Sequence, residues 1–109
     1  MESWGSIMVI FKPITTEAAL GTSSGASSNV SSSEFVRLFN SAAAGTEHLV
    51  TLEESGGTDI GTFSLEGHES VIIQKESTDK LFAADAAVLA CGVAVVEVGN
   101  PRSYTKSFK

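Results

Sequence analysis

Short apolar segments divided by turn residues recur along most of the chain, and this spacing constrains the fold more than any other feature. From residue 34 onward, turn sequences such as Gly-Gly, Glu-Gly and Ser-Thr-Asp return every 7–11 residues. The segments between them are short and rich in Val, Ile, Thr and Phe, which favours strands over helices. The pattern predicts an all-β fold, an antiparallel β-sandwich or small barrel of about 6–7 strands.

Alternation within the segments indicates which side chains face the core. In residues 69–75, Val71 and Ile73 point one way and Ile72 the other, because successive side chains of a strand face opposite sides. Residues 34–40 and 48–54 alternate in the same manner. The sequence Ser-Gly-Gly-Thr at 55–58 predicts a hairpin turn, since glycine accepts a positive φ at both central positions.

The last apolar segment, VLACGVAVVEV at residues 88–98, is the longest. Residues 83–94 are rich in alanine and are also compatible with a helix, but the many β-branched valines favour a strand. Cys91 lies in this segment and is the one cysteine, so no intramolecular disulfide and no CxxC zinc site can form. We expect Cys91 to be buried and to pack as a small apolar side chain.

The first third of the chain differs in character. Residues 7–11, IMVIF, predict a strand or extended arm that ends by Pro13, and residues 14–20 are at best weakly helical. Residues 21–33, GTSSGASSNVSSS, have the composition of a flexible linker. If this linker is ordered, either an assembly partner, which we favour, or its own chain must hold it. We therefore divide the chain into an arm and linker (1–33), a β-sandwich domain (34–100) that folds without them, and a basic tail (101–109).

Charge is unevenly distributed over the 109 residues, whose net charge is −6. All 13 acidic residues lie within residues 1–100, whereas the tail carries Arg102, Lys106 and Lys109 and no acid. An acidic body lacks the basic surface that neutralises phosphates, so we expect no nucleic-acid partner. No apolar run reaches the ~18 residues of a membrane span, so we expect no membrane partner, and we see no signal peptide.

Residue types that carry chemistry are present but scattered. His48 and His68 are the only histidines and no third ligand is implied, so we expect exposed side chains and no metal site. The sixteen serines include no G-x-S-x-G elbow, and the adjacent Glu53 and Glu54 point to opposite faces of a strand. We expect no catalytic residue, no cofactor and no enzymatic activity. The alternative is an enzyme or small-ligand-binding β domain in which both histidines and a carboxylate meet around a metal.

Apolar residues of the arm are better candidates for function. An exposed apolar arm is an adhesive patch unless something covers it. The arm either completes its own sheet or adds a strand to the sheet edge of a neighbour. We expect a partner to be contacted by residues of the arm, of the 69–75 segment and of the tail: Trp4, Ile7, Val9, Phe11, Ile72, Arg102, Tyr104 and Lys106.

The order of the segments between Val36 and Val96 forms a pattern of its own. A strand ending in Phe39-Asn40 precedes a hairpin with the return IGTFSL, the turn GHE, an apolar strand ending in QKE, the step TDKLFA and a Val-rich closing strand. This pattern resembles small virion proteins of tailed bacteriophages. The resemblance implies a β-sandwich structural protein of the particle.

On the basis of this resemblance we expect a capsid decoration or cement protein. Its partners would be the major capsid protein or other virion proteins, and it would act as a homo-oligomer in a virion assembled in the host cytoplasm. The alternative within this class is a neck, tail or host-contact component.

Overall fold

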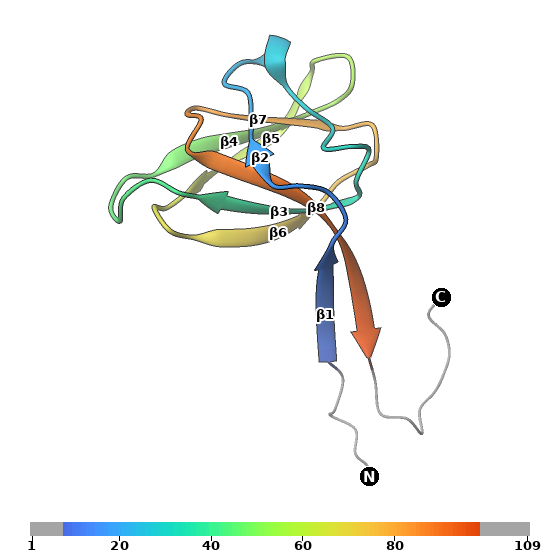
Figure 1. Ribbon diagram of the computed structural model, residues 1–109. Helices are drawn as coiled ribbons and strands as arrows, with labels where there is room; N and C mark the ends of the chain where they lie inside the picture. Colours follow the sequence, from blue (N-terminus) through green and yellow to red (C-terminus); the bar gives the residue numbers. More distant parts are fainter. Residues whose placement is uncertain (1–7, 99–109) are drawn as a thin grey trace.

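The computed structural model describes residues 8–98, which form two antiparallel β-sheets (Figure 1). Sheet A has the strand order β1-β8-β3-β6, with the short strand β2 also paired to β8, and sheet B has the order β5-β4-β7. The elements are β1 (Met8–Pro13), β2 (Ala18–Ala19), the 3-10 helix η1 (Ser24–Ala26), β3 (Phe35–Asn40), β4 (His48–Glu53), β5 (Asp59–Leu65), β6 (Ser70–Gln74), β7 (Lys80–Ala83) and β8 (Val88–Val98). The predicted all-β, sandwich-like fold is therefore confirmed. No helix within residues 8–98 is long and apolar enough to cross a bilayer.

The core between the sheets is aliphatic and follows the predicted alternation. Val36 and Leu38 of β3 are fully buried, and they face Val50 of β4 and Leu81 of β7, which are buried to the same degree. Burying a side chain of this size stabilises a fold by roughly 1.5–3 kcal/mol. Phe35, Arg37 and Phe39 alternate with them on the outer face of sheet A and are half-buried.

The predicted strand limits agree closely with the structure from residue 34 onward. β5, β7 and β8 have the expected bounds, so residues 88–94 are strand and the helical alternative is wrong. The hairpin between β4 and β5 has a loop of three residues, 55–57, in place of the predicted two, because the N–H of Glu54 donates to the carbonyl of Thr58 at 2.8 Å. The N–H of Gly57 donates to the carbonyl of Glu54 at 2.8 Å, and of the two central glycines only Gly57, at φ 98°, has a positive φ.

The Ser-rich segment is held by its own chain, so the assembly partner that we favoured as its holder is not needed. The predicted weak helix is also wrong, because Ala18 and Ala19 form β2 against β8. Further along, Ser28 and Leu81 exchange two backbone hydrogen bonds, of 3.0 and 2.8 Å, at the outer edge of β7. In Figure 1 this segment crosses from sheet A to sheet B and passes over one end of the sandwich.

Two side chains of the first third belong to the common core. Leu20 and Val30 are 4% and 9% exposed and pack with the buried residues of both sheets. Deleting residues 1–33 would remove these side chains together with β1 and β2. The expectation that residues 34–100 fold without residues 1–33 stays a prediction.

A left-handed turn places the side chain of Val30 in the core. Val30, Ser31 and Ser32 have φ angles of 53°, 57° and 59°, a conformation that costs roughly 1–2 kcal/mol for each residue other than glycine. Hydrogen bonds offset part of this cost. The hydroxyl of Ser33 donates to the carbonyl of Val30 at 2.6 Å, and the N–H of Ser32 donates to Oδ1 of Asn29 at 3.1 Å.

Candidate contact surface

A two-stranded ribbon leaves the sandwich at the end of β8. β3 pairs with β8 from Val88 to Val93, whereas β1 pairs with it from Val93 to Val98. Beyond Val93, β8 therefore has β1 as its only strand partner among residues 8–98. In Figure 1 β1 and the end of β8 project together from the body. A two-stranded ribbon alone is marginally stable in water, because neither of its faces is covered.

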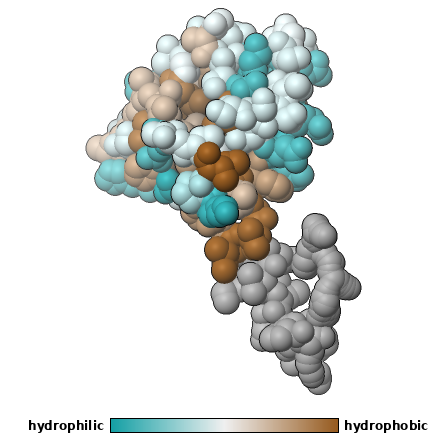
Figure 2. Space-filling model, turned by 45° about the vertical axis from the view of Figure 1, so that its right-hand side comes forward, coloured by the Kyte–Doolittle hydropathy of each residue, from teal (hydrophilic) through white to brown (hydrophobic). Residues whose placement is uncertain are grey.

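The described side chains of the ribbon are largely apolar and open to solvent. Phe11 and Val95 lie opposite each other on one face and are 43% and 36% exposed. Ile10 and Val96 form the corresponding pair on the other face and are 46% and 45% exposed. Figure 2 shows apolar side chains gathered where the body narrows toward the ribbon.

A groove of about 330 Å³ lies where the ribbon meets the outer face of sheet A. Phe11 and Val95 line it from the ribbon, Phe35 from β3 and Ile72 from β6. Ile73 and Gln74 complete the lining, and Gln74 is its one polar residue. The groove collects side chains from four strands because β3 and β6 pair next to the point where β8 turns outward. Its surface suits an apolar side chain of a partner.

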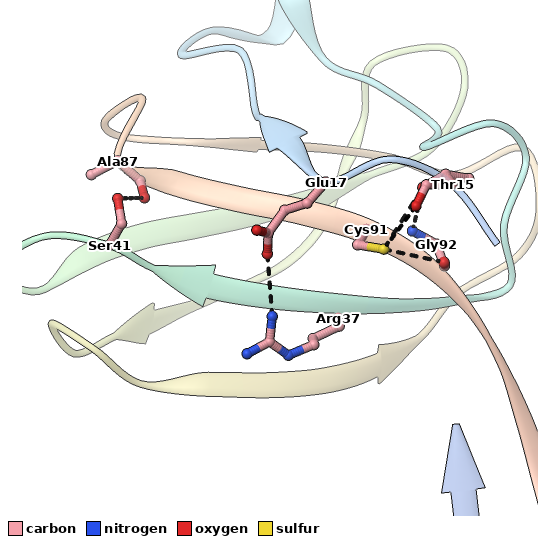
Figure 3. Close-up of polar contacts among 7 residues, drawn as sticks. All are labelled: Thr15, Glu17, Arg37, Ser41, Ala87, Cys91 and Gly92. Atoms are coloured by element: carbon pink, nitrogen blue, oxygen red, sulfur yellow. Dashed lines mark hydrogen bonds and ion pairs between the residues drawn. The ribbon is translucent and has the colours of Figure 1, made fainter. Parts of the chain in front are cut away.

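Arg37 and Phe39 of β3 have partners on the outer face of sheet A. Arg37 bonds to Glu17 at 3.2 Å, which fastens the segment after β1 across the sheet (Figure 3). The same guanidinium lies 5.5 Å from the ring centroid of Phe39, and the ring of His68 stacks on Phe39 with centroids 6.5 Å apart. These two side chains are therefore engaged within the chain.

The irregular segment after β1 is pinned to the middle of β8. The hydroxyl of Thr15 accepts a hydrogen bond from the N–H of Gly92 at 2.8 Å (Figure 3). The carbonyl of Gly92 accepts one from the N–H of Ile14 at 2.8 Å. Cys91 is buried beneath this contact, and its Sγ lies 3.2 Å from the carbonyl of Thr15. The prediction of a buried thiol is confirmed. These bonds fix the base of the ribbon on the sandwich.

A buried carboxylate holds the Ser-rich segment at the other end of the molecule. Glu53 is fully buried, whereas Glu54 is exposed, as their opposite faces predict. The hydroxyl of Ser24 lies 2.9 and 2.7 Å from the two oxygens of Glu53 and donates to the carboxylate. A hydrogen bond to a charged group contributes about 1.5–3 kcal/mol, so this contact is a substantial part of what keeps η1 in place. The sequence offers no signal for this pairing.

A second cavity lies under the left-handed turn. It has a volume of about 310 Å³ and is lined by hydroxyl and small apolar side chains: Thr15, Thr16, Ala18, Ala19, Leu20, Ser28, Val30, Ser31 and Ala90. None of these residues carries a charge. The hydroxyls that line it belong to segments that hold the arm on the body, which indicates a structural role.

The two histidines lie in separate surroundings. His48 is only 19% exposed, more buried than predicted, and its Nε2 is 3.9 Å from a carboxylate oxygen of Asp85. His68 is exposed on the tight turn after β5 and packs against Phe39. Within residues 8–98, no three His, Cys, Asp or Glu side chains are grouped as metal ligands.

Acidic side chains cluster beside His68. A hydrogen bond that protonated Glu66 donates to Glu47, and the negative charges of Glu47 and Glu69, raise the pKa of Glu66 above its usual 4.5. Burial lowers the pKa of Lys75, while Asp79 and Glu34 act in the opposite direction. Glu66 and Lys75 both lie in turns between strands. Neither residue lines the groove or the second cavity.

The predicted contact residues fall into three groups. The structure brings Phe11 and Ile72 together in one groove, although they are far apart in the sequence. Val9 lies in β1, where only its backbone is described. The other five lie outside the described residues: Trp4, Ile7, Arg102, Tyr104 and Lys106.

Sequence reasoning missed the other four lining residues of the groove, Phe35, Ile73, Gln74 and Val95. Alternation indicated that Phe35 lies opposite Val36, but not that its face borders the ribbon.

Comparison of the chain with protein-family models, with curated proteins and with solved structures finds no match in any of the three.

Proposed function

We propose that this chain is a structural component of a bacteriophage particle, a capsid decoration or cement protein that binds the shell through protein–protein contacts. The observation that carries the proposal is the groove formed by Phe11, Phe35, Ile72 and Val95, which a single chain leaves open. Covering apolar surface stabilises a complex by about 25 cal/mol for each Å² removed from water. The resemblance of residues 36–96 to virion proteins supports the same reading.

The chemistry of the groove favours a protein partner over a small ligand. Sites for small molecules combine an apolar pocket with several convergent polar groups that fix orientation. Here Gln74 is the one polar residue of the lining, and the groove opens along the outside of a sheet. An apolar side chain from the major capsid protein would fill it without requiring further polar contacts.

The number of copies per particle tests the proposal. Quantitative mass spectrometry of purified virions should find the chain in numbers comparable to those of the major capsid protein. A complete absence from purified virions rejects the proposal. A few to some tens of copies would favour the neck, tail or host-contact alternative.

Matched substitutions then test the groove. Phe11→Asp and Ile72→Asp should abolish binding to shells that lack the protein, because each places a charge in the apolar contact. Ile60→Asp is the control, since Ile60 is 50% exposed but lies on β5 of the other sheet. Equal binding by all three variants would show that the groove is not the contact site.

A further inference from the structure

The outer edge of β1 is an open strand edge. Ile14 donates its N–H to the carbonyl of Gly92, so Ile14 and Gly92 stand at a hydrogen-bonded position of the antiparallel ladder, although the N–H of Gly92 bonds to the hydroxyl of Thr15. Such pairs alternate with non-hydrogen-bonded pairs, so Lys12 and Ile10 bond to β8 while Phe11 and Val9 turn their N–H and C=O groups away from it. β1 is the terminal strand of sheet A, and no other strand within residues 8–98 meets these groups.

β1 has few of the features that usually protect a strand edge from pairing. Proteins block such edges with charged residues, proline, bulges or a covering segment. In β1, Lys12 is the only charged residue and Pro13 stands at the very end of the strand. Ile10 and Phe11 expose apolar surface on both faces beside this edge. The edge is therefore suited to pairing with another strand.

We propose that β1 pairs antiparallel with β1 of a second copy of this chain, around a two-fold axis at Ile10. In this register Val9 of each copy lies opposite Phe11 of the other, and every open N–H group of these two residues finds a carbonyl. An axis at Phe11 would instead place Val9 opposite Pro13, which has no N–H to donate. The pairing joins the two copies of sheet A into one continuous sheet.

The side chains also suit this register. Ile10 of one copy faces Ile10 of the other as a non-hydrogen-bonded pair, with Cα atoms about 4.5 Å apart. Val96, which lies opposite Ile10 within each chain, continues the same apolar row on both sides. Pairing around Ile10 therefore covers surface that each copy exposes alone.

Charge favours a second copy over an unrelated strand. Residues 8–98 contain twelve acidic and four basic residues, a net charge of −8, whereas residues 99–109 contain three basic residues and no acid. Met8 and Val98 are paired at the tip of the ribbon, so both ends of the chain continue from there. Antiparallel pairing directs each tip toward the body of the other copy. A second copy therefore offers an acidic surface beside the point where the described residues 8–98 end.

The mass of the full chain in solution tests the inference, which does not depend on the proposed place in a particle. Light scattering after size exclusion, from about 1 to about 100 μM to bracket micromolar affinities, should reach twice the 11.3 kDa of one chain. Phe11→Pro should return the mass to that of a monomer. It removes an N–H that points away from β8 and that would bond to Val9 of the second copy. A monomeric wild type throughout this range would overturn the inference.

A cross-link tests the register. Ile10→Cys should form a disulfide between copies under mild oxidation, because residues opposite each other in a non-hydrogen-bonded pair lie within disulfide distance. Ile14→Cys is the control, since Ile14 is more exposed, at 54%, but lies beyond the paired strand. Thermal unfolding of each variant checks that it remains folded. A dimer that persists in Phe11→Pro, or cross-links equally at both cysteines, would contradict the proposed pairing.

Discussion

Asn40, at the end of β3, forms hydrogen bonds with three neighbouring segments, and its substitution should lower the stability of the fold more than most others. The side chain is fully buried. Its Nδ2 donates to the carbonyls of Leu65 at 2.8 Å and Thr46 at 3.0 Å, and its Oδ1 accepts from the N–H of Ala42 at 3.0 Å. The backbone of Asn40 also accepts from the N–H of His68 at 2.7 Å. The end of β5, the loop after β3 and the turn before β6 thus converge on one residue.

The expected cost follows from these contacts. Each hydrogen bond contributes about 0.5–1.5 kcal/mol, and a buried group left without a partner costs about 1–3 kcal/mol. Asn40→Ala breaks three hydrogen bonds of a fully buried side chain, so we expect a loss of about 3 kcal/mol in the free energy of unfolding. A small domain has only about 5–15 kcal/mol of stability in total. The midpoint of thermal unfolding should fall by roughly 10–20 °C.

Urea unfolding followed by far-ultraviolet circular dichroism measures this loss. Asn40→Asp keeps the volume and the acceptor for Ala42 but has no donors, so it should destabilise the domain at least as much as alanine. Asn29→Ala, which removes one exposed hydrogen bond to Ser32, should cost less than about 1 kcal/mol. A loss below about 1 kcal/mol for Asn40→Ala would refute the reasoning, because the loops would then be held by other contacts.

Three further predictions concern a turn, the Ser-rich segment and pH. Gly67→Ala should cost about 2 kcal/mol in unfolding experiments, because its Cβ would overlap a backbone carbonyl of the loop after β3. Ser24→Ala should cost about 2 kcal/mol and speed proteolysis near η1, because it leaves the buried carboxylate of Glu53 without its hydroxyl donor. Thermal scans should show stability falling as pH rises from about 4.5, the usual pKa of Glu66. The reason is that the folded state holds the proton of the Glu66 carboxyl more tightly than the unfolded chain does. Glu47→Gln should weaken this fall in stability.

Each of these predictions has a control or a contrary outcome. Gly56→Ala should be nearly neutral, since nothing lies within 4 Å of its added Cβ, and equal costs at both glycines would contradict the steric argument. Ser27→Ala removes only an exposed bond to a carbonyl, so equal proteolysis of both serine variants would argue against the role of the buried carboxylate. An unchanged pH profile in Glu47→Gln would show that another group causes the fall in stability.

Strand positions were predictable from residue 34 onward because they depend on local patterns. Alternation in β3 and β6 reports burial directly, and glycine or hydroxyl residues mark the turns between strands. The turn at 76–79 shows this, since the N–H of Glu76 bonds to the carboxylate of Asp79 at 3.1 Å. Such signals involve neighbours in the sequence and need no knowledge of the fold.

The first third of the chain and the groove depend on contacts between distant residues. A Ser-rich composition indicates a linker, yet Leu20 and Val30 supply enough burial, and Ser24 finds a buried carboxylate, to dock the segment. Exposure of Phe11 was predictable from the apolar arm. Its position beside Ile72 was not, because it depends on the order of strands in sheet A.

Residue-resolved hydrogen exchange of the amides of β1 tests most directly whether the ribbon is a contact surface. In dilute solution the N–H of Phe11 should exchange quickly, while those of Ile10 and Lys12 are slowed by their bonds to β8. At concentrations where chains associate, the Phe11 amide should become as protected as its two neighbours. A Phe11 amide that exchanges at the same rate at every concentration would contradict the account.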